Sequence, residues 1–143
     1  MSDALPKSMN EIIPAILPKS FDDVRSALGR IEGAAPLVQI DICDGQFVHA
    51  RTWPLNPTDR THFAAIVNGT EGLPSWESFN FEVDLMVQHP ETQIPSWIAA
   101  GVTRAVVHLK SHHDWAAIKE AAGGSLELGL GIDLTPDYEL LHG

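Results

Sequence analysis

The sequence predicts an α/β protein whose strands are parallel, organised as one domain over residues 1–143. Apolar runs rich in β-branched residues alternate four times with segments of helical pattern, and a fifth apolar run follows. Because a helix-length segment separates each strand from the next, the connections are right-handed crossovers. The chain therefore holds about four and a half strand–helix units.

The individual elements follow from apolar runs and from the turn residues between them. The expected strands cover 11–17, 37–45, 81–87, 104–110 and 126–134. The expected helices cover 21–33, 58–68, 90–101 and 113–124, and a last helix begins within 136–143. Ser20 is a typical N-cap and Gly33 a typical end for the first helix, whereas Pro95 interrupts the third.

Composition narrows the classes of function. The formal net charge of −10 repels phosphate backbones and anionic membrane surfaces, so neither nucleic acid nor a membrane is an expected partner. Cys43 is the single cysteine, which leaves no disulfide framework and no paired-cysteine zinc site. With no signal-peptide pattern and no apolar run of membrane-spanning length, we expect a cytoplasmic protein.

Two arrangements fit the alternating pattern: an open, doubly wound sheet and part of a (β/α)8 barrel. The doubly wound, nucleotide-binding sheet is disfavoured, because prolines follow the first strand where a G-x-G-x-x-G fingerprint would stand. Periodicity by itself leaves both arrangements open.

Two aspartates mark the second strand and the residues after it. Asp41 lies inside an apolar run, where an unpaired carboxylate costs free energy, so it is a candidate functional residue or the remnant of one. Asp44 precedes Gly45 and is more typical of a turn or a loop cap.

Five segments, in order, resemble the ribulose-phosphate 3-epimerase family. They read IIPAIL, VQIDICDGQFV, FEVDLMVQHPE, AAGVTRAVVHLK and LGLGIDLTP, and the D-x-x-D-G-x-F-V element is the most specific. The resemblance implies a (β/α)8 (TIM) barrel of which this chain looks like the first five strands. It also implies epimerisation of a pentulose phosphate next to its ketone, through a metal-stabilised enediolate and two aspartates. Asp41 matches one of them, a metal ligand and acid/base; the other belongs to strand seven of the family barrel.

The resemblance also implies a metal site that is degenerate here. Gln39 and Asp84 stand where the family has histidines, so the set of Gln39, Asp41 and Asp84 is a poor zinc site and a weak site for Mg²⁺ or Mn²⁺. Met86 and His108 fall at family-like positions in the barrel mouth and are the candidate substrate-binding residues, although His108 fits a buried core histidine equally well.

Other residues near the expected mouth have simpler interpretations. Ala15 replaces a family serine, and Asp133 would complete a four-carboxylate rim with Asp41, Asp44 and Asp84. The SHHD segment, 111–114, is interpreted as a solvated helix cap rather than a metal site. The four tryptophans are expected to cover the core or a subunit contact; they are Trp53, Trp76, Trp97 and Trp115.

A five-stranded part of a barrel raises a problem of stability. The strands 37–45 and 104–110 look apolar on both faces, and helices would cover one face alone. Exposing several hundred Å² of apolar sheet would forfeit on the order of 10 kcal/mol, so we expect a homodimer in which two partial barrels close on each other.

Three hypotheses of function follow. The first is an epimerase-like half barrel that self-associates and has little or no epimerase activity on its own. The second is an active sugar-phosphate epimerase or isomerase completed by a partner chain. The third is a non-catalytic scaffold or cation-binding module.

Overall fold

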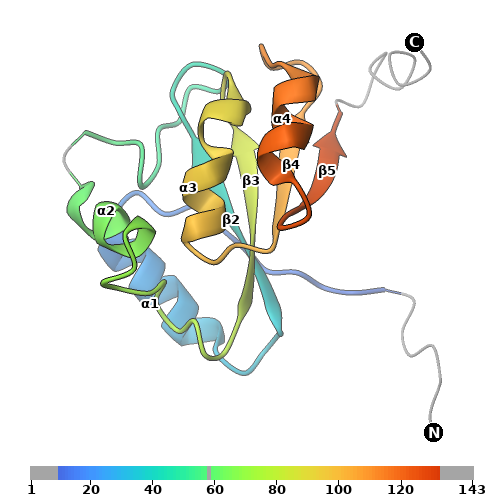
Figure 1. Ribbon diagram of the computed structural model, residues 1–143. Helices are drawn as coiled ribbons and strands as arrows, with labels where there is room; N and C mark the ends of the chain where they lie inside the picture. Colours follow the sequence, from blue (N-terminus) through green and yellow to red (C-terminus); the bar gives the residue numbers. More distant parts are fainter. Residues whose placement is uncertain (1–9, 58, 133–143) are drawn as a thin grey trace, which may run out of the picture.

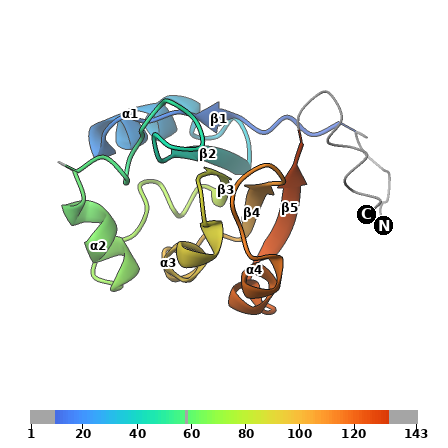
Figure 2. The ribbon, with the colours of Figure 1, turned by 90° about the horizontal axis from the view of Figure 1, so that it is seen from above.

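The structure is a computed structural model that describes residues 10–57 and 59–132. Its five strands form one parallel sheet in the order β1-β2-β3-β4-β5 (Figure 1; β1 is labelled in Figure 2). The strands are β1 (Ala15–Ile16), β2 (Leu37–Cys43), β3 (Asn80–Met86), β4 (Arg104–His108) and β5 (Glu127–Gly131). The predicted parallel α/β fold is confirmed.

The α-helices lie along one side of this sheet (Figure 2). They are α1 (Phe21–Ile31), α2 (Thr61–Val67), α3 (Ile94–Ala99) and α4 (Trp115–Ala122), with a 3₁₀ turn at Pro90–Thr92. A strand order that follows the sequence without reversal places every right-handed crossover on the same face. A doubly wound sheet reverses its order and carries helices on both faces, so the arrangement is part of a (β/α)8 barrel.

The two longest helices begin at the caps that the sequence indicates. Ser20 Oγ accepts a hydrogen bond from the backbone N–H of Asp23 at 3.1 Å. Asp114 Oδ1 accepts one from Ala117 at 3.1 Å, which confirms the interpretation of segment 111–114 as a helix cap. Gly33 after α1 and Gly123 after α4 have positive φ, the conformation that ends many helices.

Several elements are shorter than the sequence pattern predicts. β1 has two residues rather than seven, because the prolines at 14 and 18 lack the N–H that would extend the ladder. The helix expected over 90–101 is divided into the 3₁₀ turn and α3, and Pro95 lies in the first turn of α3, where its missing N–H costs nothing. The expected last helix and Asp133 lie outside the described residues.

The core lies between the sheet and the helices. Alternate side chains of the three central strands are buried there, namely Val38, Ile40, Ile42, Phe81, Val83, Leu85, Ala105 and Val107. Trp53 and Trp97 join this core, as expected. Trp76 and Trp115 are 63% and 39% exposed, so neither covers the core of the described chain.

The other face of the sheet, here called the open face, is more polar than predicted. Between the buried positions, β2 to β4 carry Gln39, Asp41, Glu82, Asp84, Arg104, Val106 and His108. The expectation that these strands are apolar on both faces is therefore wrong: they alternate, as strands with one solvated face do.

The helices of the described chain are short. Among residues 10–57 and 59–132, no helix is long and apolar enough to cross a bilayer.

Candidate functional site

The strand register arranges the open face in layers that run across the sheet. The lower layer aligns Ala15, Gln39, Glu82, Arg104 and Glu127. The next aligns Asp41, Asp84, Val106 and Gly129, and above it Cys43 is paired with Met86 and His108 with Gly131. Because side chains of one layer point the same way from neighbouring strands, residues far apart in sequence meet here.

The lower layer contains a partly buried ion pair. Glu82 is 5% exposed, and its Oε1 accepts a hydrogen bond from Arg104 Nε at 2.5 Å. Arg104 also lies 3.7 Å from the exposed carboxylate of Glu127, and the hydrogen bond to Glu82 raises the pKa of Arg104. This pair compensates a carboxylate that burial would otherwise make costly.

Asp41, the candidate acid/base, lies one layer above and is partly buried. Its Oδ1 accepts a hydrogen bond from the side-chain amide of Gln39 at 2.7 Å. Burial raises the pKa of Asp41 above its ordinary value of 3.8, the neighbouring carboxylates of Asp84 and Glu82 add to the rise, and the Gln39 bond and His108 oppose it. Asp41 therefore gains a proton more readily than a solvated aspartate.

Asp84 and His108 form a pair across β3 and β4. His108 Nε2 lies 2.5 Å from Asp84 Oδ1, and the two side chains are 22% and 18% exposed. An ionised carboxylate can only accept, so the imidazole donates. The ring lies beside Phe47, with centroids 5.4 Å apart, and over Gly131, where a Cβ would come within 2.8 Å of it. His108 is thus a paired residue of the open face, not an apolar-core histidine.

Met86 and Cys43 close the upper end of the same face. They are cross-strand partners, and Met86 is partly buried, so the structure brings both predicted substrate-binding residues, Met86 and His108, to the upper layer. Burial raises the pKa of the Cys43 thiol, and its neighbour Asp41 adds to the rise. Ala15, at the family serine position, is aligned with Gln39.

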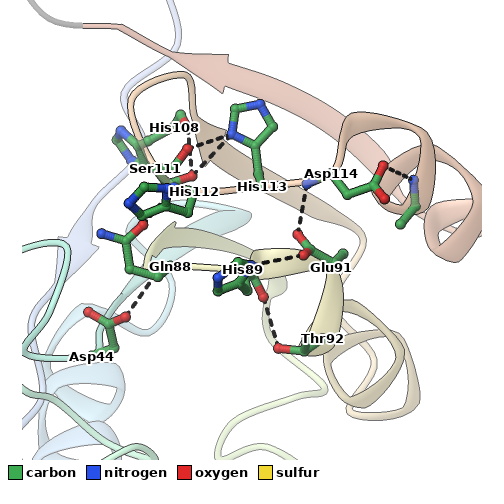
Figure 3. Close-up of polar contacts among 11 residues, drawn as sticks. Asp44, Gln88, His89, Glu91, Thr92, His108, Ser111, His112, His113 and Asp114 are labelled. Carbon is green, nitrogen blue, oxygen red and sulfur yellow. Dashed lines mark hydrogen bonds and ion pairs between the residues drawn. The ribbon is translucent and has the colours of Figure 1, made fainter.

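The loops that follow β2, β3 and β4 are joined by hydrogen bonds (Figure 3). Asp44 caps its own loop at the N–H groups of Gln46 and Phe47, and accepts from Gln88 N–H at 2.8 Å. Gln88 in turn accepts from His112 N–H at 2.6 Å. The turn interpretation of Asp44 is confirmed, and its bond to Gln88 also ties the loop after β2 to the loop after β3.

The open face does not fit the metal ion that the family resemblance implies. Gln39 donates an N–H to one carboxylate oxygen of Asp41, and His108 donates one to an oxygen of Asp84. Across the described ranges, no three His, Cys, Asp or Glu side chains are grouped closely enough to hold a metal ion. The degenerate site predicted at Gln39, Asp41 and Asp84 is therefore assembled as hydrogen-bonded pairs.

Sequence reasoning missed several residues of this face. Glu82 and Arg104 lie in segments that were predicted as apolar strands, and no role was assigned to them. The signal was their spacing: Glu82 is two residues before Asp84 and Arg104 is four residues before His108, so each pair lies on one face of its strand. Phe47 and Gly131 stand in segments that resemble the family, but their contacts were not predicted, because these depend on the position of the His108 ring.

Comparison with known protein families gives a match that covers most of the chain. The model of the ribulose-phosphate 3-epimerase family matches residues 11–123, which contain the first four strands and Asp41, Asp84 and His108. No curated protein sequence matches the chain. The match covers most of the 143 residues, and the sheet has the sequential parallel strand order of part of a (β/α)8 barrel. The chain therefore belongs to the ribulose-phosphate 3-epimerase family.

Proposed function

We propose that this protein is an epimerase-like half barrel that self-associates and has little or no epimerase activity on its own. The supporting observation is the pairing on the open face. The two positions that the family resemblance assigns to imidazole ligands carry Gln39 and Asp84, whose side chains bond to Asp41 and His108.

The electrostatics of this face oppose the family reaction. Removing a proton next to a ketone places negative charge on an enediolate oxygen, and catalysis requires positive charge or strong donors at that oxygen. Here the developing charge would meet Asp41, Asp84 and Glu82. Arg104 and His108, two hydrogen-bond donors of the open face, are already engaged by Glu82 and Asp84. Asp41 can exchange a proton, but the intermediate is not stabilised.

A direct assay tests the proposed inactivity. The purified chain is incubated with a pentulose 5-phosphate in buffer with Mn²⁺, Fe²⁺ or Zn²⁺, and epimer formation is followed by a coupled assay. The matched control is Asp41→Asn, which removes the family acid/base. We expect equal background rates for both proteins. Turnover that needs a metal ion and is lost in Asp41→Asn would contradict the proposal and favour an enzyme completed by a partner chain.

The proposed self-association follows from the two ends of the sheet. Within the described residues, β1 and β5 each pair with one neighbouring strand, which leaves two backbone edges for further pairing. Four of the exposed large apolar side chains lie at these edges, namely Ile12 and Leu17 beside β1 and Leu130 and Ile132 at β5. A two-fold axis parallel to the strands would pair β1 of each copy with β5 of the other, twice.

Light scattering coupled to size exclusion measures the assembly. We expect a mass of about twice 15.6 kDa, and a smaller mass for Leu130→Asp, which places a charge at the β5 edge. Glu120→Asp, on the exposed surface of α4 and outside both edge strands, is the control and should leave the mass unchanged. A monomer of the unaltered chain at micromolar concentration would contradict the proposed self-association. It would not bear on the proposed inactivity, which the epimerase assay tests.

A further inference from the structure

We infer that the N–H donors of Gln39 and His108 replace the metal ion, so that Asp41 and Asp84 are held as a metal-independent pair of carboxylates. The inference deepens the proposed function and rests on it, because it concerns the same face. The inference is tested by a different property: it predicts that the unaltered chain does not bind a metal ion, and it makes no prediction about turnover or assembly.

The first step is the geometry of the two carboxylates. Asp41 and Asp84 are cross-strand partners in the parallel register of β2 and β3, so their side chains leave the sheet side by side. Two carboxylates so placed repel each other unless something positive compensates them. In a metal site the cation does so; here each accepts a protein N–H, at 2.7 Å from Gln39 and at 2.5 Å from His108.

The second step is that the His108 donor is held in place. A Cβ on Gly131 would lie 2.8 Å from His108 Cε1 and Nδ1, so the ring occupies space that the glycine leaves free. The Phe47 ring packs beside it, and Ser111 Oγ donates to the His108 carbonyl at 2.8 Å. The donor is therefore preorganised for Asp84 in the folded chain.

The third step is competition. A divalent ion that bound here would have to displace both donors from the carboxylate oxygens. Zinc needs about four strong ligands and Mg²⁺ or Mn²⁺ about six oxygens. The open face offers two carboxylates and one weak carboxamide within this set. Binding a metal thus costs two charge-assisted hydrogen bonds without supplying a complete ligand shell.

The test measures the binding of MnCl₂ and ZnCl₂ by titration calorimetry and by the thermal unfolding midpoint. The unaltered chain should show neither a binding heat nor a rise in midpoint. His108→Leu removes the donor to Asp84 and leaves that carboxylate uncompensated beside Asp41, so its affinity for Mn²⁺ should rise at least about tenfold. Val106→Leu, on the same face but without a donor, is the matched control and should behave as the unaltered chain.

A second variant keeps the test decisive if His108→Leu does not fold. Gln39→His with Asp84→His restores imidazoles at the two positions and should bind zinc with an affinity at least about tenfold above the unaltered chain. Tight one-to-one binding of zinc or manganese by the unaltered chain would overturn the inference. So would a folded His108→Leu variant with no gain for Mn²⁺, or, where that variant does not fold, a double variant with no gain for zinc. An inactive chain that binds metal would contradict this inference alone.

Discussion

The two faces of the sheet differ although the same strands build both. On the helix-covered face, β2 to β4 present side chains such as Ile40, Val83 and Val107, all of them within the core. On the open face the alternate residues include Asp41, Asp84 and His108, which pair with one another or with Gln39. A period of two in the side-chain direction is enough to separate the two chemistries.

The difference teaches where stability and function reside in this chain. Apolar burial dominates the favourable free energy of folding, so the helix-covered face should carry most of the stability. The open face is held by ion pairs and hydrogen bonds, each of which contributes little net free energy because the groups are also well solvated when unfolded. The following substitutions test this contrast, from the largest expected effect to the smallest.

Adjacent valines on β4 provide the most direct test. Val107 is 1% exposed under the helices, whereas Val106 is partly exposed on the open face. Val107→Ala should cost about 2–3 kcal/mol of unfolding free energy through lost burial and a cavity, and Val106→Ala less than about 1 kcal/mol. Urea denaturation of both variants measures the difference. Equal costs would mean that the open face is packed as tightly as the core, for example by a partner.

The ion pair of the lower layer is the expected exception on the open face. Arg104→Met leaves the buried carboxylate of Glu82 without its partner and should cost about 2 kcal/mol. Glu82→Leu in the same chain removes that carboxylate and should recover about half of the loss. A double-mutant cycle by denaturation provides the measurement; a loss below about 0.5 kcal/mol for Arg104→Met would show that Glu82 is solvated.

Two glycines of β5 probe the position of the His108 ring. A Cβ at Gly131 would lie 2.8 Å from that ring, whereas at Gly129 the closest atom, Val106 Cγ2, is at 3.4 Å. Gly131→Ala should therefore displace His108 and lower stability by about 1 kcal/mol. Gly129→Ala, the control, should change it by less than about 0.5 kcal/mol. Thermal unfolding, together with the imidazole NMR shift of His108, distinguishes the two; an unmoved resonance in Gly131→Ala would contradict the placement of the ring.

Asp41→Asn should have the smallest effect on stability. Burial raises the pKa of Asp41 in the folded chain above 3.8, so the folded state loses stability as the pH rises from 3.8 through the raised value, and the full cost is present above it. At neutral pH the unfolding midpoint of Asp41→Asn should be unchanged or up to about 2 °C higher. Below pH 3.8 both states are protonated, and this gain should disappear. A midpoint that falls by several degrees at neutral pH would show that Asp41 anchors a structural network.

The sequence by itself determined the parallel α/β class, the order of the elements, the caps at Ser20 and Asp114 and the unusual position of Asp41. These features depend on neighbours within one turn or one strand, and period-two or helical spacing makes them readable along the chain. The sequence did not predict the bounds of β1, or that 90–101 forms a 3₁₀ turn followed by a separate helix. Both depend on prolines, whose effect is set by which backbone N–H group is missing.

Only the tertiary structure decided that the helices share one face, that the open face is polar, and that Asp84 pairs with His108. These two residues are 24 positions apart, and their contact depends on the register in which Asp84 meets Val106. Alternation along a strand determines which face a residue occupies, but which residues meet across two strands depends on how the complete crossovers pack on the sheet. The same packing places Gly131 beneath the His108 ring. The pairing of His108 with Asp84 could therefore be identified only from the paired strands.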